Sequence, residues 1–383
     1  MLKKDITFIY SDSAERAIYE PLASEAEKRG YQVRMTDNPY ERCEIGFYCQ
    51  HVNFPQYSRF SLIMLHDIIQ QYGDWPDIWI NEPWNKYDIG ILPSEQWARN
   101  WKAASPYYYA RPARGMYKVG WPKADAVTRL KDPAYREAFC DQYGLDRKRR
   151  TVLYAPAWEN DNKEDDFIRA VQGLEVNIII KQWDADPKKY PGQVENVRRM
   201  KEMHENLPGV IILPPETNIF KAIAASDILV SEESSTMCEA TMMGIPAISV
   251  SDWLIPDRTP SRPAKCGYDF VFPTVKAELT EKVRDILEHY PEYQAKTAEF
   301  CRRNFENIGR TSAMIMDIID DCVNGKEIRY AALEPAAPKK LPLKKYIGHK
   351  VYCFRREAAY NYAVNHRVFG FIWKGMRKAL RQR

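Results

Sequence analysis

Short apolar runs that alternate with amphipathic stretches constrain the fold of this chain more than any other feature. A strand-like run at Asp5–Tyr10 is followed by apolar residues at helical spacing over Ala14–Lys28, and then by a second run at Tyr31–Met35. Two strands joined through a helix pair in parallel. This order predicts an α/β domain with a parallel sheet and helices on its faces. Its further strand-like runs are Ile45–Cys49, Phe60–Leu65, Ile89–Leu92 and Tyr117–Val119.

The same alternation resumes after the polar run Asp146–Arg150. A length of 383 residues exceeds that of a usual single domain. We therefore predict two Rossmann-like domains, 1–145 and 146–330, with a ligand cleft where the carboxyl ends of both sheets face each other. The expected strands of the second domain are Thr151–Tyr154, Val176–Lys181, Val210–Leu213, Ile228–Val230 and Ala247–Val250, and its expected helices are 163–173 and Asn218–Ala225.

The end of the chain differs from the rest in charge. After Pro338 it holds 13 Lys and Arg against one acid, Glu357, whereas residues 1–338 hold 43 bases and 51 acids. We predict that residues 331–383 form a basic, aromatic and helical tail that begins at a linker, Ala331–Pro338, and binds an anionic membrane surface. The alternatives are that the tail packs on the first domain or binds nucleic acid, and nucleic acid is not the expected partner. Its interleaved aromatic residues are Tyr346, Tyr352, Phe354, Tyr360, Tyr362, Phe369, Phe371 and Trp373.

The start of the chain and its cysteines indicate the compartment. Met1–Lys4 runs directly into the first strand without the apolar segment of an export signal, and no stretch approaches the ~20 apolar residues that span a bilayer. Eight cysteines are scattered without a C-x-x-C pair, which is typical of reduced thiols. Together with the basic tail, these features predict a cytoplasmic protein held on the inner face of the cell membrane.

The stretch Ser226–Gly244 carries the clearest binding signal. It reads as a buried strand, a polar turn, a helix and a closing glycine. If the helix begins near Ser235 or Thr236, its free amide groups and positive dipole end form an anion site, and the hydroxyls of Ser234, Ser235 and Thr236 add donors. Thr236 and Glu239 also stand at capping-box spacing. The alternative interpretation is an ordinary capped helix without a ligand.

Histidine is scarce, and His66 is the best candidate for a general base because it follows a predicted strand at its carboxyl end. The alternative is a histidine that only packs. His204 and His289 lie in charged stretches and are expected at the surface. The sequence holds no cluster with metal-ligand spacing and no cofactor motif, so neither a metal nor a cofactor is expected. Further candidates for substrate binding follow other predicted strands: Pro156, Trp158, Lys181, Gly120 and Lys123.

Five segments carry motifs in a fixed order: Leu65–His66, Val119–Asp125, Val152–Trp158, Ile180–Lys181 and Ser226–Ser235. In that order they resemble the CDP-glycerol glycerophosphotransferase family of teichoic-acid and related polymer synthesis, over roughly residues 60–255. The resemblance implies the GT-B architecture, in which two Rossmann-like domains enclose a cleft. It also implies transfer of an alditol phosphate from a CDP-activated donor to a hydroxyl of a membrane-linked glycan or polymer, with release of CMP.

The resemblance also implies roles for single residues. His66 matches the histidine proposed as the base on the acceptor hydroxyl, and Ser234 and Ser235 match a serine pair near the donor pyrophosphate. Gly120 and Lys123 match a Gly-x-Pro-Arg-x-Asp turn in which lysine replaces arginine here. Pro156 and Trp158 belong to the matching Tyr-Ala-Pro-x-Trp segment, and Lys181 to a Lys-x-His-Pro segment.

The chain departs from the family pattern at several positions. Trp183 stands where the family has its second functional histidine, and Glu159 stands in place of an arginine. Glu232 and Glu233 replace Asp-Tyr before the serine pair, which adds a negative charge beside the expected phosphate site. This charge is expected to weaken phosphate binding unless Glu233 points away or binds a donor hydroxyl or the cytosine amine. The alternatives are a donor other than CDP-glycerol and a weak activity. The alternative functions are a GT-B glycosyltransferase that uses a nucleotide sugar, and a nucleotide-binding assembly partner without turnover.

Overall fold

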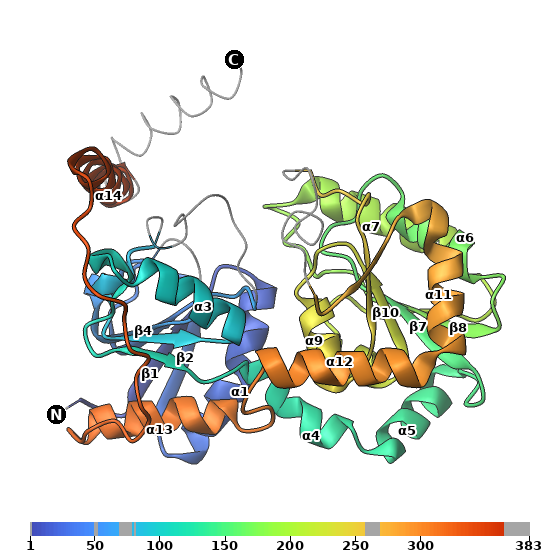
Figure 1. Ribbon diagram of the computed structural model, residues 1–383, viewed down its shortest axis with the longest axis horizontal. Helices are drawn as coiled ribbons and strands as arrows, with labels where there is room; N and C mark the ends of the chain where they lie inside the picture. The colour runs from blue at the N-terminus through green and yellow to red at the C-terminus, as the bar shows by residue number, and fades with distance from the viewer. Residues whose placement is uncertain (1, 50–52, 69–78, 80–81, 257–268, 364–383) are drawn as a thin grey trace.

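The protein consists of two Rossmann-like lobes, side by side, and a helical extension (Figure 1). The structure, a computed structural model, describes residues 2–49, 53–68, 79, 82–256 and 269–363. Each lobe contains one six-stranded sheet whose strands all run parallel. The predicted α/β class with two Rossmann-like units is therefore confirmed.

The first sheet has the strand order β2-β1-β3-β4-β5-β6. Because β2 lies on one side of β1 and all later strands lie on the other, the order reverses between β1 and β3. Open α/β sheets bind ligands outside the carboxyl ends of the strands at such a reversal. The strands are β1 Asp5–Ile9, β2 Gln32–Thr36, β3 Cys43–Tyr48, β4 Ser58–Ile63, β5 Ile89–Leu92 and β6 Met116–Lys118, and the main helices of this part are α1 Ser13–Lys28 and α3 Glu95–Ala104.

The second sheet has the order β12-β11-β10-β7-β8-β9, so its reversal lies between β7 and β10. Its central strands are wholly buried and mostly apolar, as expected for a sheet covered on both faces. Among the strands that the structure describes, the short edge strand β12, which contains a proline, is the one that the apolar pattern did not predict. The strands are β7 Arg150–Tyr154, β8 Val176–Ile180, β9 Val210–Ile212, β10 Ile228–Ser231, β11 Ala247–Val250 and β12 Phe272–Thr274. The helices are α6 Lys163–Val171, α7 Pro191–His204, α8 Ile219–Ala224, α9 Thr236–Met243, α11 Leu279–Glu288 and α12 Tyr290–Asn304.

Two helical segments lie on the opposite lobe from the one that the expected boundaries assign them to. Helix α5 (Pro133–Tyr143), which follows the short α4 (Val127–Leu130), lies below the second sheet, where Arg136 pairs with the buried Asp227 at 2.6 Å (Figure 1). Helix α12 leads back toward the first lobe, and α13 (Thr311–Val323) packs against α1. The expected boundary near residue 145 therefore separates the sheets but not the helices that cover them.

Arg29 shows why α13 belongs with the first lobe. Its guanidinium lies 2.7 Å from Asp317 and 2.9 Å from Asp320, and the hydroxyl of Tyr31 also donates to Asp320. Buried apolar residues of α13 continue the core that both lobes share. These contacts join residues 288–291 positions apart, so no local pattern predicts them.

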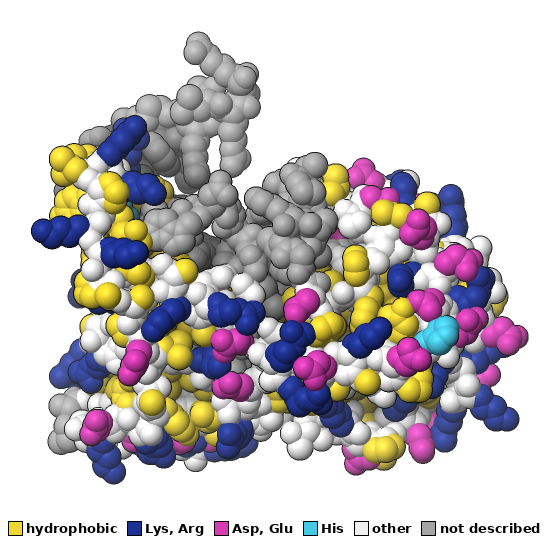
Figure 2. Space-filling view, viewed as in Figure 1, with side chains coloured by type: hydrophobic (Ala, Val, Ile, Leu, Met, Phe, Trp, Pro, Cys, Tyr) yellow, Lys and Arg dark blue, Asp and Glu magenta, His cyan; other side chains and the backbone are white. Residues whose placement is uncertain are grey.

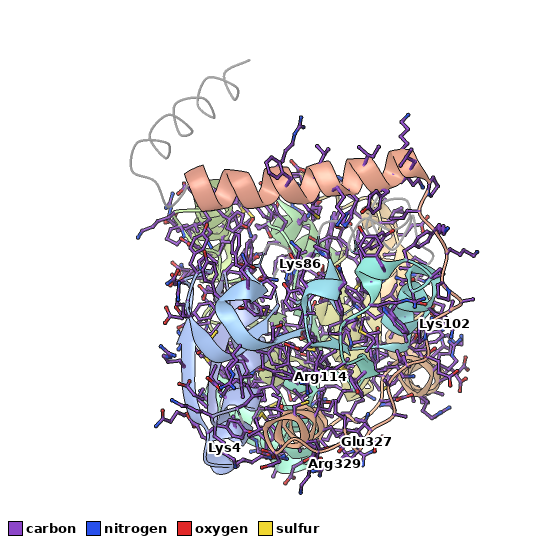
Figure 3. All side chains as sticks on the ribbon, turned by 90° about the vertical axis from the view of Figure 1, so that its left-hand side faces the viewer. Lys4, Lys86, Lys102, Arg114, Glu327 and Arg329 are labelled. Carbon is purple, nitrogen blue, oxygen red and sulfur yellow. The ribbon has the colours of Figure 1, made fainter. Side chains whose placement is uncertain are left out.

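The expected linker Ala331–Pro338 is hydrogen-bonded to the first lobe. The Leu333 amide donates to the Met116 carbonyl at 2.7 Å, and Arg111 donates to the Ala336 carbonyl at 2.8 Å. Lys102 bonds the carbonyl of Glu334 in the same segment (Figure 3). The segment leads to α14 (Leu343–Ala363), which lies across one end of the first lobe (Figure 3). The expected helical tail is thus confirmed for residues 343–363, while residues 364–383 lie outside the described residues.

Candidate functional site

Loops from both lobes meet between the two sheet reversals. Ser13, at the start of α1, donates from its hydroxyl to the Asp184 carbonyl of the second lobe at 2.8 Å. The ammonium of Lys189 bonds the Ser11 carbonyl that follows β1. The loop after β1 therefore contacts the loop after β8, so the carboxyl edges of the two sheets, where the sequence predicts its candidates, lie toward each other.

His66 lies at this point and pairs with Glu15 of α1. Its Nδ1 is 3.2 Å from a Glu15 carboxylate oxygen and 3.2 Å from the Cys49 carbonyl, and its side chain is 32% exposed. Burial disfavours the charged imidazole, but Asp67, Glu15 and Asp12 outweigh this effect and raise the pKa of His66 to about 10. The pair is therefore an imidazolium and a carboxylate at neutral pH.

Glu15 is the partner that inspection of the sequence missed. It is buried, it accepts from the Ser11 amide, and its own amide donates to Asp12, the N-cap residue of α1. The interaction with His66 lowers the pKa of Glu15 against the opposing effect of burial. The available signal was an N-cap motif directly after the first strand, Asp12-x-x-Glu15, but the motif does not reveal a histidine 51 positions later.

The start of α9 differs from the expected anion site, because the amides of residues 236–239 already donate to Ser234 and Ser235 and are not free, and the capping box is not formed either. Ser235 occupies the N-cap position without using its side chain as a cap, and Ser234, Ser235 and Thr236 are partly exposed. The Thr236 hydroxyl donates to the Ala155 carbonyl, and its amide donates to the Ser234 hydroxyl. Glu239 points toward the first lobe instead of back to Thr236.

Glu239 joins the two lobes. Its buried carboxylate accepts from the Trp121 indole at 3.1 Å and lies 2.7 Å from the Lys123 ammonium. Both partners belong to the turn after β6, in which Pro122–Ala126 form the 3-10 helix η4. Glu239 and Lys123, both predicted to bind substrate, are therefore brought together, but as partners of each other.

The two glutamates before the serine pair are both buried, and Glu232 is turned away from it. Glu232 accepts from the amides of Ala157 and Trp158 at 3.0–3.1 Å and pairs with the buried Lys163 at 3.0 Å. The charge of Glu232 is thus neutralised inside the lobe. Its hydrogen bonds to the two amides fix the loop that follows β7. Glu233 is also buried. The negative charge of Glu232, which the sequence places beside the expected phosphate site, is therefore part of a structural ion pair with Lys163.

Lys181 lies at the end of β8 in a cage of carbonyl groups. Its ammonium donates to the carbonyls of Gln182 at 2.8 Å and Pro215 at 2.6 Å. Burial and the nearby charge of Lys123 lower the pKa of Lys181 to about 8. Lys181 therefore still carries a charge at neutral pH and lies within electrostatic reach of Lys123 and Glu239.

Gly120, expected at the substrate site, packs closely against the segment before α13. Its φ is 125°, and a Cβ there would lie 2.6 Å from the Glu306 carbonyl oxygen, so glycine allows the segment before α13 to approach. Asp125 of the same turn accepts from the amides of Thr311 and Ser312 and so caps α13. The motif around Gly120 that matched the family thus joins the last helices to the first lobe.

Trp158, which follows β7, lies in a cluster of three partly exposed aromatic rings. Its ring centroid is 5.8 Å from that of Trp183 and 5.6 Å from that of Tyr190, and the latter two are 5.0 Å apart. Pro156 is buried just before this cluster. We call Trp158, Trp183 and Tyr190 the aromatic wall.

His204 was wrongly expected at the surface. It is buried, and its Nδ1 lies 2.8 Å from the equally buried Glu164. The Gln182 amide joins Glu164 to Glu159, which also accepts from the Tyr154 hydroxyl at 2.7 Å. Two members of this buried network, Glu159 and Gln182, are the sequence neighbours of Trp158 and Trp183. His289 is exposed as expected, and His51 lies outside the described residues. The described part of the chain contains no group of three or more His, Cys, Asp or Glu that forms a metal site.

Two Rossmann-like lobes, each with one parallel six-stranded sheet, whose loops after β1 and β8 contact each other have the GT-B architecture. Among solved structures, a histidine-to-asparagine variant of the wall teichoic acid polymerase TagF matches at a TM-score of 0.61 with 13% identity, over 85% of this chain and 90% of that one. The same variant soaked with CDPG matches at 0.60 with 16% identity, over the same shares of the two chains. The UDP-GlcNAc 2-epimerase of Neisseria meningitidis bound to UDP-GlcNAc matches at 0.58 with 15% identity, over 83% of this chain and all of that one.

The family comparison identifies the chain more closely. Residues 77–320 match the model of the CDP-glycerol:poly(glycerophosphate) glycerophosphotransferase family, so the chain belongs to that family and is a CDP-glycerol-type glycerophosphotransferase. No curated protein sequence matches it. His66 lies outside the matched range, while the aromatic wall, Lys181 and the start of α9 lie inside it.

Proposed function

We propose that the protein transfers glycerol phosphate, or a related alditol phosphate, from a CDP-activated donor to a hydroxyl of a membrane-linked glycan or polymer and releases CMP. The observation that supports the proposal is the family match over residues 77–320, together with the ion pair between His66, which follows β4, and Glu15 of α1. The TagF structure soaked with CDPG, which shares the fold, supports a CDP-linked donor. The partly exposed hydroxyls of Ser234 and Ser235 would contact the donor phosphates.

The reaction is an in-line displacement at the phosphorus that bears the alditol. The acceptor oxygen forms the new phosphorus–oxygen bond, the bond to CMP breaks, and the acceptor proton passes to His66. Because the pKa of His66 is about 10, the neutral base is the minor form at pH 7. Catalysis then depends mostly on positioning and on stabilisation of the leaving phosphate by Lys181 and the Ser234 and Ser235 hydroxyls.

Incubation with CDP-glycerol, CDP-ribitol and nucleotide sugars tests the proposal directly. CMP release with a phosphodiester product supports it. Release of a nucleoside diphosphate with a glycoside product would instead identify the alternative, a glycosyltransferase that uses a nucleotide sugar. Absence of turnover with every donor and acceptor would favour a binding partner.

We further propose that α14 holds the protein on an anionic membrane from the cytoplasmic side. Apolar side chains of Leu343, Ile347, Val351 and Phe354 are 43–74% exposed, and basic residues lie between them (Figure 2). On the other side, His349 packs on Tyr109 at 5.0 Å, so the helix is held to the body by one face. Exposed apolar groups beside bases suit a bilayer surface. None of the helices in the described ranges is long and apolar enough to cross a membrane.

A variant that ends at Pro342 tests this role because it keeps the docked segment 331–338. We expect it to lose binding to anionic vesicles, at about 1 kcal/mol per removed base near the surface, while its thermal unfolding stays that of the full chain. A variant with Leu343 and Phe354 replaced by serine isolates the apolar contribution. Equal vesicle binding by the full and shortened chains would contradict the proposal.

A further inference from the structure

The aromatic wall is the feature of the cleft that the transfer chemistry leaves unused. It combines a residue after β7, a residue after β8 and the residue before α7, so three separate segments place their rings together. All three rings are partly exposed, although aromatic side chains of this size are usually buried when they only pack. Trp183 stands where the family has a histidine, and an indole presents a broad apolar face with no charge.

The wall is held rigidly from behind. The Trp158 amide donates to Glu232 and its carbonyl accepts from Lys163. The amide of Gln182, the residue before Trp183, joins Glu159 and Glu164 in the buried network. A preorganised surface loses little conformational freedom when a ligand binds to it, which is a property of binding sites.

A chain of contacts connects the wall to the reacting histidine. Lys189, the neighbour of Tyr190, bonds the Ser11 carbonyl; the Ser11 amide donates to Glu15; and Glu15 pairs with His66. Asp12 and Glu15 also contribute to the raised pKa of Tyr190, which places that ring within electrostatic reach of the pair. The wall therefore lies on the acceptor side of the cleft, where the base is proposed to act.

The charges around His66 disfavour a polyanionic acceptor at this place. Asp12, Glu15 and Asp67 act on His66 from the first lobe, and the Lys189 ammonium acts on Asp12 from the second, so three carboxylates face two cations here. A poly(glycerol phosphate) chain carries one negative charge per unit and would meet these carboxylates, whereas a neutral sugar would not. A pyranose ring presents C–H groups on one face, which pack on aromatic rings, and hydroxyls at its edge, one of which would reach His66.

From this arrangement we infer that the aromatic wall formed by Trp158, Trp183 and Tyr190 binds a pyranose ring of the acceptor, so that the hydroxyl that receives the alditol phosphate belongs to a sugar. The inference rests on the proposed function and specifies its acceptor. Trp183 is then a specificity-determining residue, because a histidine at that position would offer a smaller ring and a titratable group in place of the indole face.

Binding of neutral sugars to the full chain without donor tests the inference separately from turnover. The probes are N,N′-diacetylchitobiose and maltose, with glycerol phosphate as the anionic comparison, and the measurement is calorimetric titration. We expect at least one disaccharide to bind, Trp183→Ala to weaken it five- to tenfold or more, and Trp183→Phe to weaken it less than threefold. Tyr108→Ala, which removes a 38% exposed ring from the outer side of the first lobe, is the matched control and should bind like the wild type.

Three results would overturn the inference. In the first, neither disaccharide binds. In the second, Trp183→Ala binds the disaccharide as tightly as the wild type. In the third, the KM of Trp183→Ala rises for CDP-glycerol but not for the acceptor, which would make the wall a donor subsite. If Trp183→Ala fails to fold, Trp183→His provides the same comparison. Sugar binding without any CMP release would contradict the proposed function and leave the sugar site standing, so the two failures are distinguishable.

Discussion

Replacement of Glu15 by glutamine removes one negative charge beside His66 and keeps the shape of the side chain. In the wild type, one carboxylate oxygen lies 3.2 Å from His66 Nδ1 and the other accepts from the Ser11 amide. The glutamine oxygen can still accept from Ser11, which leaves its amide group facing His66. Asp12 continues to cap α1 through the amide of residue 15. The fold should therefore persist while the electrostatics of His66 change.

The size of the effect follows from the distance. Two unit charges 3.2 Å apart interact with about 5 kcal/mol at an effective dielectric constant of about 20. The exposed third of the imidazole reduces this value, and Asp67 and Asp12 still act on the ring. If the interaction is worth only about 1.4 kcal/mol after this reduction, its loss still shifts the protonation equilibrium of His66 tenfold toward the neutral imidazole. We therefore expect the pKa of His66 to fall clearly below about 10 in Glu15→Gln.

The Glu15→Gln substitution also changes the free energy of unfolding, over a pH range that the raised pKa of His66 defines. Because the pKa of His66 is raised in the folded state, its contribution to stability is fully present below its ordinary value of 6.5 and is lost as the pH rises through about 10. The wild type should thus exceed Glu15→Gln in free energy of unfolding near pH 7, and the difference should shrink toward pH 10. Urea titrations at several pH values measure it.

Proton NMR titration of the histidine ring protons, with His66→Asn used to assign the His66 signal, gives the pKa in both proteins. The rising limb of CMP release against pH should follow the same value if His66 is the base. Identical titration of His66 in the wild type and Glu15→Gln would refute the reasoning about the pair. A rate that is constant up to pH 9 and falls above it would refute the base role and indicate an imidazolium that stabilises charge.

Three further substitutions test the site and its support. His66→Ala should lower turnover by about 10²–10⁴-fold and leave CDP-glycerol binding near normal; unchanged turnover removes His66 from the mechanism. Burial raises the pKa of Glu159 from 4.5 to about 7, so the wild type should lose about 3 kcal/mol of stability relative to Glu159→Gln between pH 4.5 and pH 8, and a difference independent of pH would be inconsistent with this. Lys163→Met leaves Glu232 buried without its cation and should cost about 3–5 kcal/mol in urea unfolding, with partial recovery in Lys163→Met/Glu232→Gln; no recovery would show that the pair is not the cause.

The candidate residues show how far sequence reasoning reached. The start of α9, His66 after β4, and Trp158 and Lys181 after their strands were all predicted from local patterns, because the carboxyl ends of parallel strands meet at one edge of a sheet. Their charge states were not predictable. The pKa of His66 depends on Glu15, and the direction of Glu239 depends on Trp121 and Lys123, which come from distant segments.

Local patterns also failed where burial reversed the meaning of a polar residue. His204 and Glu164 lie in charged stretches, yet their side chains are buried because they satisfy each other. Glu232 stands beside a serine pair in sequence but turns toward the amides after β7. A charged residue reads as exposed in a sequence unless its partner is known.

The sequence alone therefore determined most of the strands, the two parallel sheets and the sheet edge at which the candidate residues lie, since apolar spacing and turn residues act over a few positions. Only the tertiary structure decided which lobe α5 and α13 cover, which carboxylate faces His66, and that three aromatic rings gather beside the pair. These features depend on contacts between residues far apart in the chain, whose free energies are set by burial and distance rather than by neighbouring residues.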